Sequence, residues 1–356
     1  MSTLKHDTLK APEYVPPAIE SVLLVGGCGF LGLHLLEQFY KLSPRPRIHV
    51  LDVREITSDL NGTGVDISEI TVHIGDITSE SSVSEVLKLS KPTVVVHSAS
   101  PIHGLGPAVY RKVNVDGTKV LVKECKKAGV EYFIYTSSAG VVFNGDNLYG
   151  VDETCPFPDE AMDAYNLTKQ QAETFVLRAN CDEFKTVAIR PAGIFGPGDR
   201  QMIPSLRQMA ERGLNKIQLG DNCNLFDVTY VGNVAYAHVI AAQRLLSGHA
   251  GIAGEAFFIT NDKPIYFWSF AKEIWKQDGK LPNTSYKIPY SAALVLGYLS
   301  QWGCALVGKE PSFTPFRVRT ACATRYYDIS KAKARLGYQP QWSLEEAIRE
   351  TLCSRR

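Results

Sequence analysis

The segment Ser21–Gly32, which reads S-V-L-L-V-G-G-C-G-F-L-G, predicts the fold of this chain. Its apolar run, Val22–Val25, stops abruptly at glycine, as a buried strand of a parallel sheet does. Gly26, Gly29 and Gly32 then recur at every third position. Such glycines allow a tight turn, close approach of the backbone to a pyrophosphate, and close packing of the next helix. We therefore expect a strand, a glycine turn and a helix whose N-terminal N–H groups bind phosphate.

An acidic residue stands where a dinucleotide site needs one. A second apolar run, 48–51, ends in Asp52, twenty residues after Gly32. This is the place of the carboxylate that holds the adenosine ribose hydroxyls. Arg54 follows and would suit a 2′-phosphate instead, but the Asp52 carboxylate would repel that phosphate. We expect NAD as the cofactor, and NADP is not excluded. The expected cofactor contacts from this part of the chain are Gly26, Gly29, Phe30, Leu31, Gly32 and Asp52.

Two later apolar runs bring further residues to the same edge. The run 70–74 ends in Gly75-Asp76-Ile77, where Asp76 would accept the amine of adenine or cap the helix that follows. The run 93–97 gives way to the small residues Ser98 and Ala99, which permit close approach to the cofactor. We expect Asp76, Ile77, Ser98 and Ala99 to lie beside the dinucleotide.

Apolar strands and helices alternate up to about residue 195. The pattern predicts an α/β fold of the Rossmann type, a doubly wound parallel sheet covered on both faces. Beyond the glycine- and proline-rich loop at 191–198 the alternation breaks down, which indicates a smaller mixed α/β lobe near the C-terminus. The expected division is a flexible arm at 1–20, an NAD(P)-binding domain at 21–195 with returns at about 226–246 and 256–260, and a substrate-binding lobe at 196–225 and 261–350.

Composition narrows the function further. The formal net charge of the 356 residues is +1, so no bulk field attracts nucleic acid. The eight cysteines form no Cys-x-x-Cys pair and no ligand spacing, so we expect reduced thiols and no metal site. The polar N-terminus lacks the apolar core of a secretory signal, and we expect an intracellular protein.

Tyr165 and Lys169 lie four apart in a helical stretch, and therefore on one face of the helix. A tyrosine hydroxyl has a pKa of about 10, too high for a base at neutral pH. A neighbouring ammonium favours the phenolate and would lower that pKa. Tyr165 would then take the proton of an alcohol as hydride leaves for the cofactor. Ser138, just past the end of a strand, would hydrogen-bond the substrate oxygen. Asn114 is either a buried, satisfied amide or a link in a water chain behind Lys169.

Together these motifs resemble those of the extended short-chain dehydrogenase/reductases, from about Val22 to Ile348. Within that family the chain is most similar to the 3β-hydroxysteroid dehydrogenase branch, and there to the fungal sterol-4α-carboxylate 3-dehydrogenases (decarboxylating). The strings that carry the resemblance are G-G-C-G-F-L-G (26–32), G-D-I (75–77), Y-T-S-S-A-G-V-V-F (135–143), Y-N-L-T-K (165–169), R-P-A-G-I-F-G-P-G-D-R (190–200) and G-D-N-C-N-L-F-D-V-T-Y-V-G-N-V-A-Y-A-H (220–238).

The resemblance implies NAD(P)-dependent oxidation of a 3β-hydroxyl on a sterol or triterpenoid-like substrate, with or without loss of a 4α-carboxylate. It assigns the catalytic serine to Ser138, the base to Tyr165 and the cation to Lys169. Pro191 and Ile194 match positions that line the nicotinamide. Candidates to hold a substrate carboxylate are Arg200, Arg317 and Arg319.

The segment 288–308 holds 21 residues without a charge. Its helical stripe of Val295, Leu299, Trp302 and Leu306 suits a core helix, a pocket wall or a helix on a membrane surface. Serine, glutamine and glycine residues dilute it as a membrane span. A lipid-like substrate favours peripheral membrane association. We expect the protein at the cytosolic face of the endoplasmic reticulum membrane or in the cytoplasm. The sequence leaves homodimer formation open.

Three other interpretations share these motifs. A tailoring 3β-hydroxysteroid dehydrogenase of terpenoid metabolism would differ only in pocket shape. A nucleotide-sugar epimerase or dehydratase would need cationic groups for a diphosphate, against which the apolar segment 288–308 argues. A redox-silent NAD-sensing protein would usually have lost the tyrosine or the lysine, and both stand here.

Overall fold

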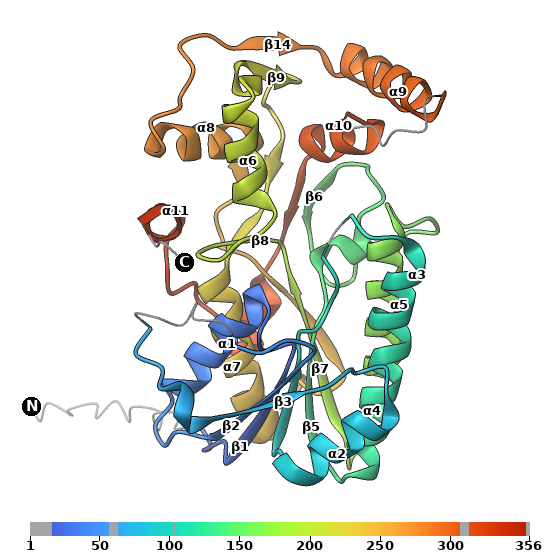
Figure 1. Ribbon diagram of the computed structural model, residues 1–356, viewed down its shortest axis with the longest axis vertical. Coiled ribbons are helices and arrows are strands. Elements are labelled where there is room, and N and C mark those ends of the chain that lie inside the picture. The colour runs from blue at the N-terminus through green and yellow to red at the C-terminus, as the bar shows by residue number, and fades with distance from the viewer. Residues whose placement is uncertain (1–15, 57–62, 103, 307–312, 354–356) are drawn as a thin grey trace, which may run out of the picture.

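The structure is a computed structural model that describes residues 16–56, 63–102, 104–306 and 313–353. Its centre is a seven-stranded parallel sheet (Figure 1). In spatial order the strands are β12 (Glu255–Ile259), β7 (Lys185–Pro191), β5 (Tyr132–Thr136), β4 (Val94–His97), β1 (Ser21–Val25), β2 (Arg47–Asp52) and β3 (Ile70–Ile74). The predicted Rossmann-type sheet is therefore confirmed, with its change of winding direction between β1 and β4.

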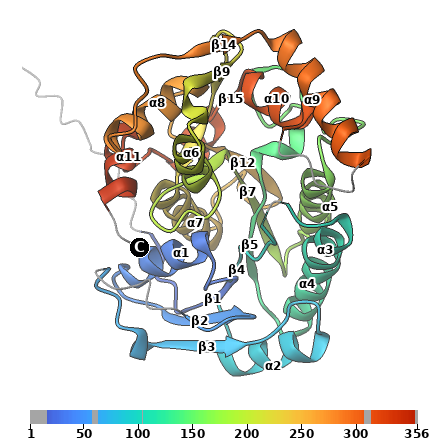
Figure 2. The same ribbon diagram turned by 45° about the horizontal axis from the view of Figure 1, so that its top comes forward.

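Helices cover both faces of this sheet, because its strands are apolar on both sides. One face carries α1 (Phe30–Tyr40) and α7 (Val231–Leu246), which pack against each other. The other face carries α2 (Glu80–Ser90), α4 (Thr118–Lys127) and α5 (Ala164–Arg178). Figure 2 shows the two helical layers on opposite sides of β4, β5 and β7. The helix predicted after the glycine turn and the strand predicted to end in Asp52 are both present.

The apolar pattern of the sequence predicts one long helix at 110–129, but the structure interrupts it. It consists of α3 (Pro107–Tyr110), a π-helical segment η3 (Arg111–Gly117) and α4. A π-segment has one extra residue per turn and is common at functional sites, because it redirects the side chains within it. Asn114, the polar residue singled out in the sequence, lies in this segment.

A second set of elements lies above the carboxyl ends of the large sheet (Figure 1). Its four-stranded sheet has the order β13 (Ile265–Tyr266), β10 (Leu225–Phe226), β15 (Arg325–Tyr327) and β6 (Leu148–Val151). Two smaller pairs are β8 (Gly193–Phe195) with β11 (Val228–Tyr230), and β9 (Ile217–Leu219) with β14 (Tyr286–Ile288). The helices here are α6 (Met202–Glu211), α8 (Phe267–Gln277), α9 (Tyr290–Leu306), α10 (Pro315–Cys322) and α11 (Leu344–Cys353).

The chain crosses between the two sets more than once. After α6 and β9 it returns through α7 to the large sheet, where β12 pairs with β7. It then leaves again for α8, α9 and α10. These crossings lie in the regions where the sequence predicts returns, and the domain boundaries themselves stay a prediction. The first fifteen residues of the expected arm and the last two of segment 288–308 lie outside the described residues.

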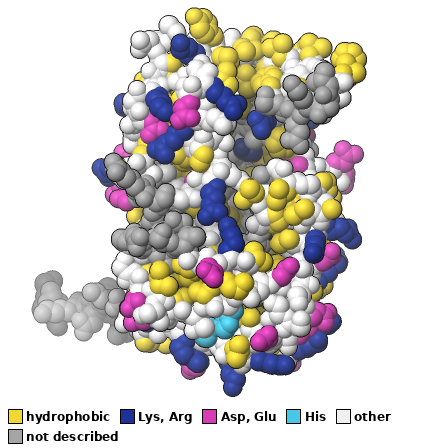
Figure 3. Space-filling view, viewed as in Figure 1, with side chains coloured by type: hydrophobic (Ala, Val, Ile, Leu, Met, Phe, Trp, Pro, Cys, Tyr) yellow, Lys and Arg dark blue, Asp and Glu magenta, His cyan; other side chains and the backbone are white. Residues whose placement is uncertain are grey.

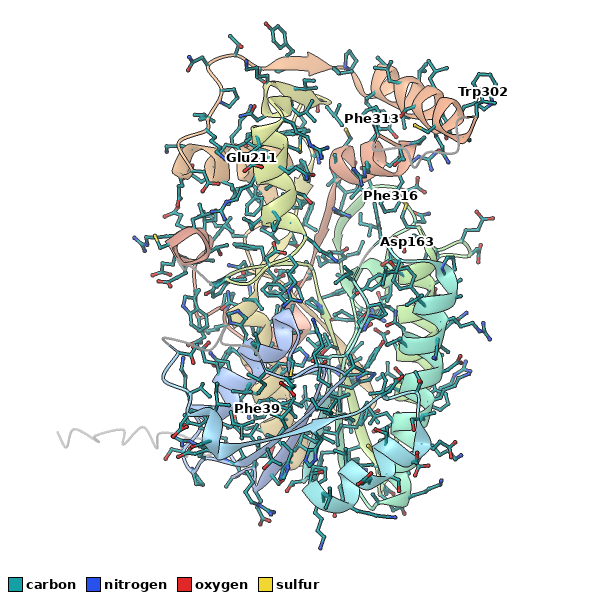
Figure 4. The ribbon with its side chains drawn as sticks, in the orientation of Figure 1. Phe39, Asp163, Glu211, Trp302, Phe313 and Phe316 are labelled. Atoms are coloured by element: carbon teal, nitrogen blue, oxygen red, sulfur yellow. The ribbon has the colours of Figure 1, made fainter. Side chains whose placement is uncertain are left out.

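Helix α9 leaves most of its large apolar side chains in solvent. Val295, Leu299, Trp302 and Leu306 are all more than half exposed. Figure 3 shows hydrophobic side chains gathered over this part of the molecule, and Figure 4 shows Trp302 at the outer end of α9, directed away from the body of the protein. In the described ranges no helix is both long and apolar enough to cross a bilayer.

Candidate active site

The carboxyl ends of four neighbouring strands bring the predicted site residues to one edge of the sheet. Gly26 follows β1, Ser98 and Ala99 follow β4, Ser138 follows β5, and Pro191 ends β7. In an open parallel sheet this edge, at the point where the winding reverses, is where ligands bind. Sheet topology therefore gathers residues that are up to 165 positions apart in the sequence.

The glycine turn is as tightly packed as its spacing predicts. Gly26 has φ +83°, and a Cβ there would lie 2.6 Å from Cα of Ala99. A Cβ on Gly32 would collide with the backbone of Gly26 and Gly27. At Gly29 a Cβ would meet only the Gly26 carbonyl at 3.1 Å and Arg54 at 4.0 Å. The turn thus packs against β4 and α1 while its Gly29 face stays open, which suits a pyrophosphate.

The Asp52 carboxylate is fixed beside this turn. It is only 7% exposed. One of its oxygens accepts the Cys28 backbone N–H at 3.0 Å, and the other accepts that of Arg54 at 3.1 Å. The Arg54 side chain is half exposed, and its Nε lies 3.6 Å from the carboxylate. The acid is thus held at the end of β2, where a ribose diol would be bound.

The remaining expected cofactor contacts divide into exposed and structural positions. Asp76 is exposed and accepts the Thr78 N–H at 2.8 Å, while the cap of α2 is Ser79. The Ser98 hydroxyl donates to the Val25 carbonyl at 3.0 Å, so it ties β4 to β1. Ile77 and Leu31 are buried, Phe30 and Ile194 are partly buried, and Pro191 is buried at the end of β7.

Lys169 lies beneath the sheet edge with almost no contact to solvent. It is 2% exposed, and its ammonium donates a hydrogen bond to the Thr136 carbonyl at the end of β5. The same nitrogen lies 4.4 Å from the ring centre of Tyr135. Burial lowers the pKa of Lys169 to about 7, against the opposing charge of Glu173.

The pKa of Tyr165 differs from the sequence expectation. Burial raises it to about 12, and a hydrogen bond with the Ser100 hydroxyl opposes this rise. Lys169, with a pKa of about 7, has lost its charge at the high pH at which a phenol with a pKa of about 12 ionises, so it does not lower that value. The lowering of this pKa by Lys169 together with a positively charged nicotinamide therefore stays a prediction.

Asn114 connects to Tyr165 and its helix α5 through two side chains. Its Nδ2 donates to the Thr168 hydroxyl at 3.1 Å, and its Oδ1 accepts from the Ser100 hydroxyl at 3.0 Å. Asn114 is 1% exposed. It is thus a buried, satisfied amide, and through Ser100 it supports Tyr165.

Ser138 begins a short 3₁₀ helix, η4 (Ala139–Val142). Its Oγ accepts the Gly140 N–H at 3.1 Å, and the side chain stays partly exposed. The hydroxyl proton is therefore available to a substrate oxygen. Asn166, next to Tyr165 on α5, packs so closely on Gly140 that a Cβ there would collide with it. This contact joins the serine segment to the tyrosine helix.

Sequence reasoning did not single out the two histidines that flank Lys169. His238 from α7 lies 2.7 Å from the Thr136 hydroxyl, and His97 at the end of β4 lies 2.9 Å from the Thr118 hydroxyl. Burial, together with the charge of Lys169, lowers the pKa of His238 to about 4 and that of His97 to about 3. Both rings are neutral near pH 7. His97 ends β4, but His238 lies in the middle of α7, and no local motif marks either residue.

A cavity of about 460 Å³ opens in the upper part of the molecule. Its walls include the loop 145–147, which follows η4, together with Tyr290 at the start of α9 and Arg319 on α10. Arg319 is exposed, as are the other two expected carboxylate partners, Arg200 and Arg317. Among the described residues no cluster of histidine, cysteine or acidic side chains is arranged to hold a metal ion.

Comparison with known proteins finds relatives along nearly the whole chain. The chain is 51% identical over 339 residues to "Sterol-4-alpha-carboxylate 3-dehydrogenase ERG26, decarboxylating" of Saccharomyces cerevisiae, covering 94% of this chain and 97% of that protein. It is 36% identical over 341 residues to the human "Sterol-4-alpha-carboxylate 3-dehydrogenase, decarboxylating", covering 94% and 87%.

Solved structures share the fold at lower identity. The Thermus thermophilus UDP-glucose 4-epimerase in complex with NAD has a TM-score of 0.69 and 20% identity, covering 93% of this chain and 97% of that chain. The Bordetella bronchiseptica enzyme WbmH in complex with NAD+ has a TM-score of 0.71 and 16% identity, covering 94% and 98%. The family model described as "3-beta hydroxysteroid dehydrogenase/isomerase family" matches residues 23–290. The chain belongs to the 3-beta hydroxysteroid dehydrogenase/isomerase family.

Proposed function

We propose that this protein oxidises the 3β-hydroxyl of a sterol that carries a 4α-carboxylate, with NAD as the hydride acceptor, and that the carboxylate is then lost as carbon dioxide. The observation that carries the proposal is the 51% identity, over 94% of the chain, to a decarboxylating sterol-4-alpha-carboxylate 3-dehydrogenase. Retention of Ser138, Tyr165 and Lys169 at one sheet edge supports it.

The residues of the cofactor crevice fit NAD. The open face at Gly29 would take the pyrophosphate, and the Asp52 carboxylate would hold the adenosine ribose. Asp76, Ile77, Ser98, Ala99, Pro191 and Ile194 complete the proposed crevice. NAD, when bound, supplies the hydride acceptor and a positive charge. Burial raises the pKa of Tyr165 to about 12, and the added positive charge would favour the phenolate.

In the oxidation step Ser138 donates a hydrogen bond to the C3 oxygen, and the Tyr165 phenolate takes the hydroxyl proton. The C3 hydride leaves with its electron pair, so C3 becomes a ketone. The product is a β-keto acid. Its C4–carboxylate bond then breaks, carbon dioxide leaves, and the electron pair forms an enolate at C3 and C4. Ser138 and Tyr165 would stabilise the enolate oxygen before C4 takes a proton.

The test is a matched pair of 3β-hydroxysterols with and without a 4α-carboxylate, supplied with NAD or NADP. We expect NADH absorbance and carbon dioxide release in equal amounts with the acid. NADH without carbon dioxide would retain the dehydrogenase and refute decarboxylation. NADH from neither sterol would refute the proposed function.

We propose that the exposed face of α9 lies on a membrane surface, from which a sterol would enter. Tyr290, Tyr298 and Trp302 lie among its exposed aliphatic side chains. Aromatic rings of this kind favour the boundary between headgroups and acyl chains. The double variant Leu299→Glu, Trp302→Glu should lose flotation with phosphatidylcholine vesicles, whereas Glu211→Gln should keep it. A wild-type protein that does not float, or that forms a dimer through α9, would overturn this proposal.

A further inference from the structure

Strand β15 brings an arginine close to η4, the short helix that follows Ser138. It lies between β10 and β6, and Arg325 pairs with Phe226 and Leu148. The guanidinium of Arg325 lies 5.2 Å from the ring centre of Phe143, the residue that ends η4. Two residues along, the Tyr327 hydroxyl donates to the Ala139 carbonyl at 3.3 Å. The strand thus contacts both ends of the short helix that begins after Ser138.

The charge of Arg325 is held within the protein. Burial lowers the pKa of Arg325, yet its side chain keeps some accessible surface. In the described part of the chain no carboxylate lies within ion-pair distance of it. The nearest acid along the sheet is Asp227, whose N–H donates to the Arg325 carbonyl at 3.0 Å. The Asp227 carboxylate instead accepts the Tyr327 N–H at 2.9 Å.

Arg190 is a buried arginine of the same protein that is paired with a carboxylate, and it serves as a comparison. It meets Glu173 with both Nε and Nη2, at 3.0 and 2.6 Å. A desolvated arginine gains most from a carboxylate that accepts two parallel hydrogen bonds. Arg325 has the aromatic face of Phe143, which compensates only part of its lost hydration. Its remaining donors therefore suit an anionic group of a ligand.

We propose that Arg325 binds the carboxylate of the substrate and thereby selects an acid adjacent to the reacting alcohol. This inference rests on the proposed function. The hydroxyl and the carboxylate of a β-hydroxy acid sit on neighbouring carbons, so the cation that recognises the acid has to be close to Ser138. Arg325 meets this condition through its contact with the serine segment. Arg200 and Arg319 are exposed, whereas Arg325 is half-buried beside η4.

The experiment compares Arg325→Gln and Arg325→Lys with the wild-type chain. The substrates are a 3β-hydroxysterol with a 4α-carboxylate and the same sterol with a 4α-methyl group. For Arg325→Gln we expect kcat/KM for the acid to fall about 100-fold, since a buried charge loses its partner. The value for the methyl sterol should change by less than about 3-fold. Arg325→Lys should recover about tenfold on the acid, because it restores the charge but not the bidentate geometry.

A binding measurement separates this inference from the proposed function. The enzyme–NAD complex is titrated with a 3-deoxy sterol that carries the 4α-carboxylate, and with its 4α-methyl counterpart. Wild type should prefer the acid, and Arg325→Gln should lose that preference. Arg212→Gln, which changes the exposed arginine that follows α6, is the matched control and should keep it. The inference is overturned if wild type shows no preference, if Arg325→Gln binds the acid as wild type does, or if it loses both ligands equally. If wild type oxidises neither sterol, the proposed function fails, and the binding measurement still decides the role of Arg325.

Discussion

The sheet edge at Lys169 and the outer face of α9 differ in which side chains they bury and which they expose. At the sheet edge a charged lysine is 2% exposed, among neutral histidines and a buried carboxylate. On α9 a tryptophan is 68% exposed, and its apolar neighbours are also in solvent. In each place residues stand in the environment that their chemistry disfavours. Such reversals cost stability and mark surfaces that act on something else.

The difference predicts where substitutions matter. At the sheet edge the removal of one polar group should leave its partner buried and unpaired, with large effects on turnover or folding. In the upper elements matched substitutions should change turnover and stability very little. A variant at the sheet edge is therefore best compared with a control variant of the same substitution type in the upper elements.

The largest effect is expected for Tyr165→Phe, which removes the proposed proton acceptor. Turnover should fall by about 1,000-fold, because general base catalysis typically contributes a factor of this size. NAD affinity should hold, since the ring remains. Tyr298→Phe is the control, on the exposed part of α9. Steady-state NADH formation and NAD titration check both; near-normal turnover in Tyr165→Phe would end the assignment of the base.

Among the sheet-edge variants, Glu173→Gln should lower the free energy of unfolding the most. Glu173 is fully buried and pairs with Arg190, so the substitution leaves that guanidinium without its counter-charge. Breaking a buried pair from one side costs about 3–5 kcal/mol. The control Glu211→Gln interrupts an exposed pair with Lys280 and should cost less than about 1 kcal/mol. Urea unfolding measures both, and equal costs would contradict the contrast between the two regions.

Lys169 should make stability depend on pH. Its pKa falls from 10.5 in the unfolded chain to about 7 in the folded protein. The unfolded chain therefore binds more protons between these values, and stability from this group should rise as pH increases from about 7 towards 10. The slope should approach about 1.4 kcal/mol per pH unit.

Lys169→Met should remove this slope, and Lys272→Met in the upper elements should not. Unfolding free energies at pH 7, 8 and 9 give the comparison. If the dependence of the unfolding free energy on pH is unchanged in Lys169→Met, burial does not lower the pKa of Lys169.

The smallest effect is expected for Asp52→Ser. The affinity for NAD should fall about tenfold with loss of one charged hydrogen-bond acceptor, and discrimination against NADP should relax, as Arg54 then meets the 2′-phosphate without a competing carboxylate. Asp221→Ser, in a turn of the upper elements, is the control. Calorimetric titration with both cofactors checks the result; an unaltered preference for NAD would remove Asp52 from the ribose.

The cofactor half of the site was predictable because its signals are local. The glycine turn, Asp52 and the helix with Tyr165 and Lys169 each depend on neighbours within one strand–turn–helix unit. Alternating apolar strands also predicted the parallel sheet. The helix at 110–129 was predicted as continuous, because propensity does not register the extra residue that makes η3 a π-segment.

The arginine that we propose to bind the substrate was not predictable in the same way. Arg200, Arg317 and Arg319 were the candidates for a substrate carboxylate, with no motif to choose among them, and Arg325, which contacts η4, was not included. Its position depends on the pairing of β15 with β6, whose partners are 177 residues apart, at Leu148 and Arg325. The two histidines around Lys169 come from α7 and β4, and no motif joins them.

The amino-acid sequence by itself determined the glycine turn, the carboxylate at the end of β2 and the tyrosine–lysine face of α5, because each needs only short-range spacing. Tertiary structure decided where charge is buried. It directs the Lys169 ammonium to the Thr136 carbonyl, and it sets Arg325 against Phe143. The physical reason is that desolvation and pairing depend on which distant strands and helices meet, and spacing along the chain does not encode that.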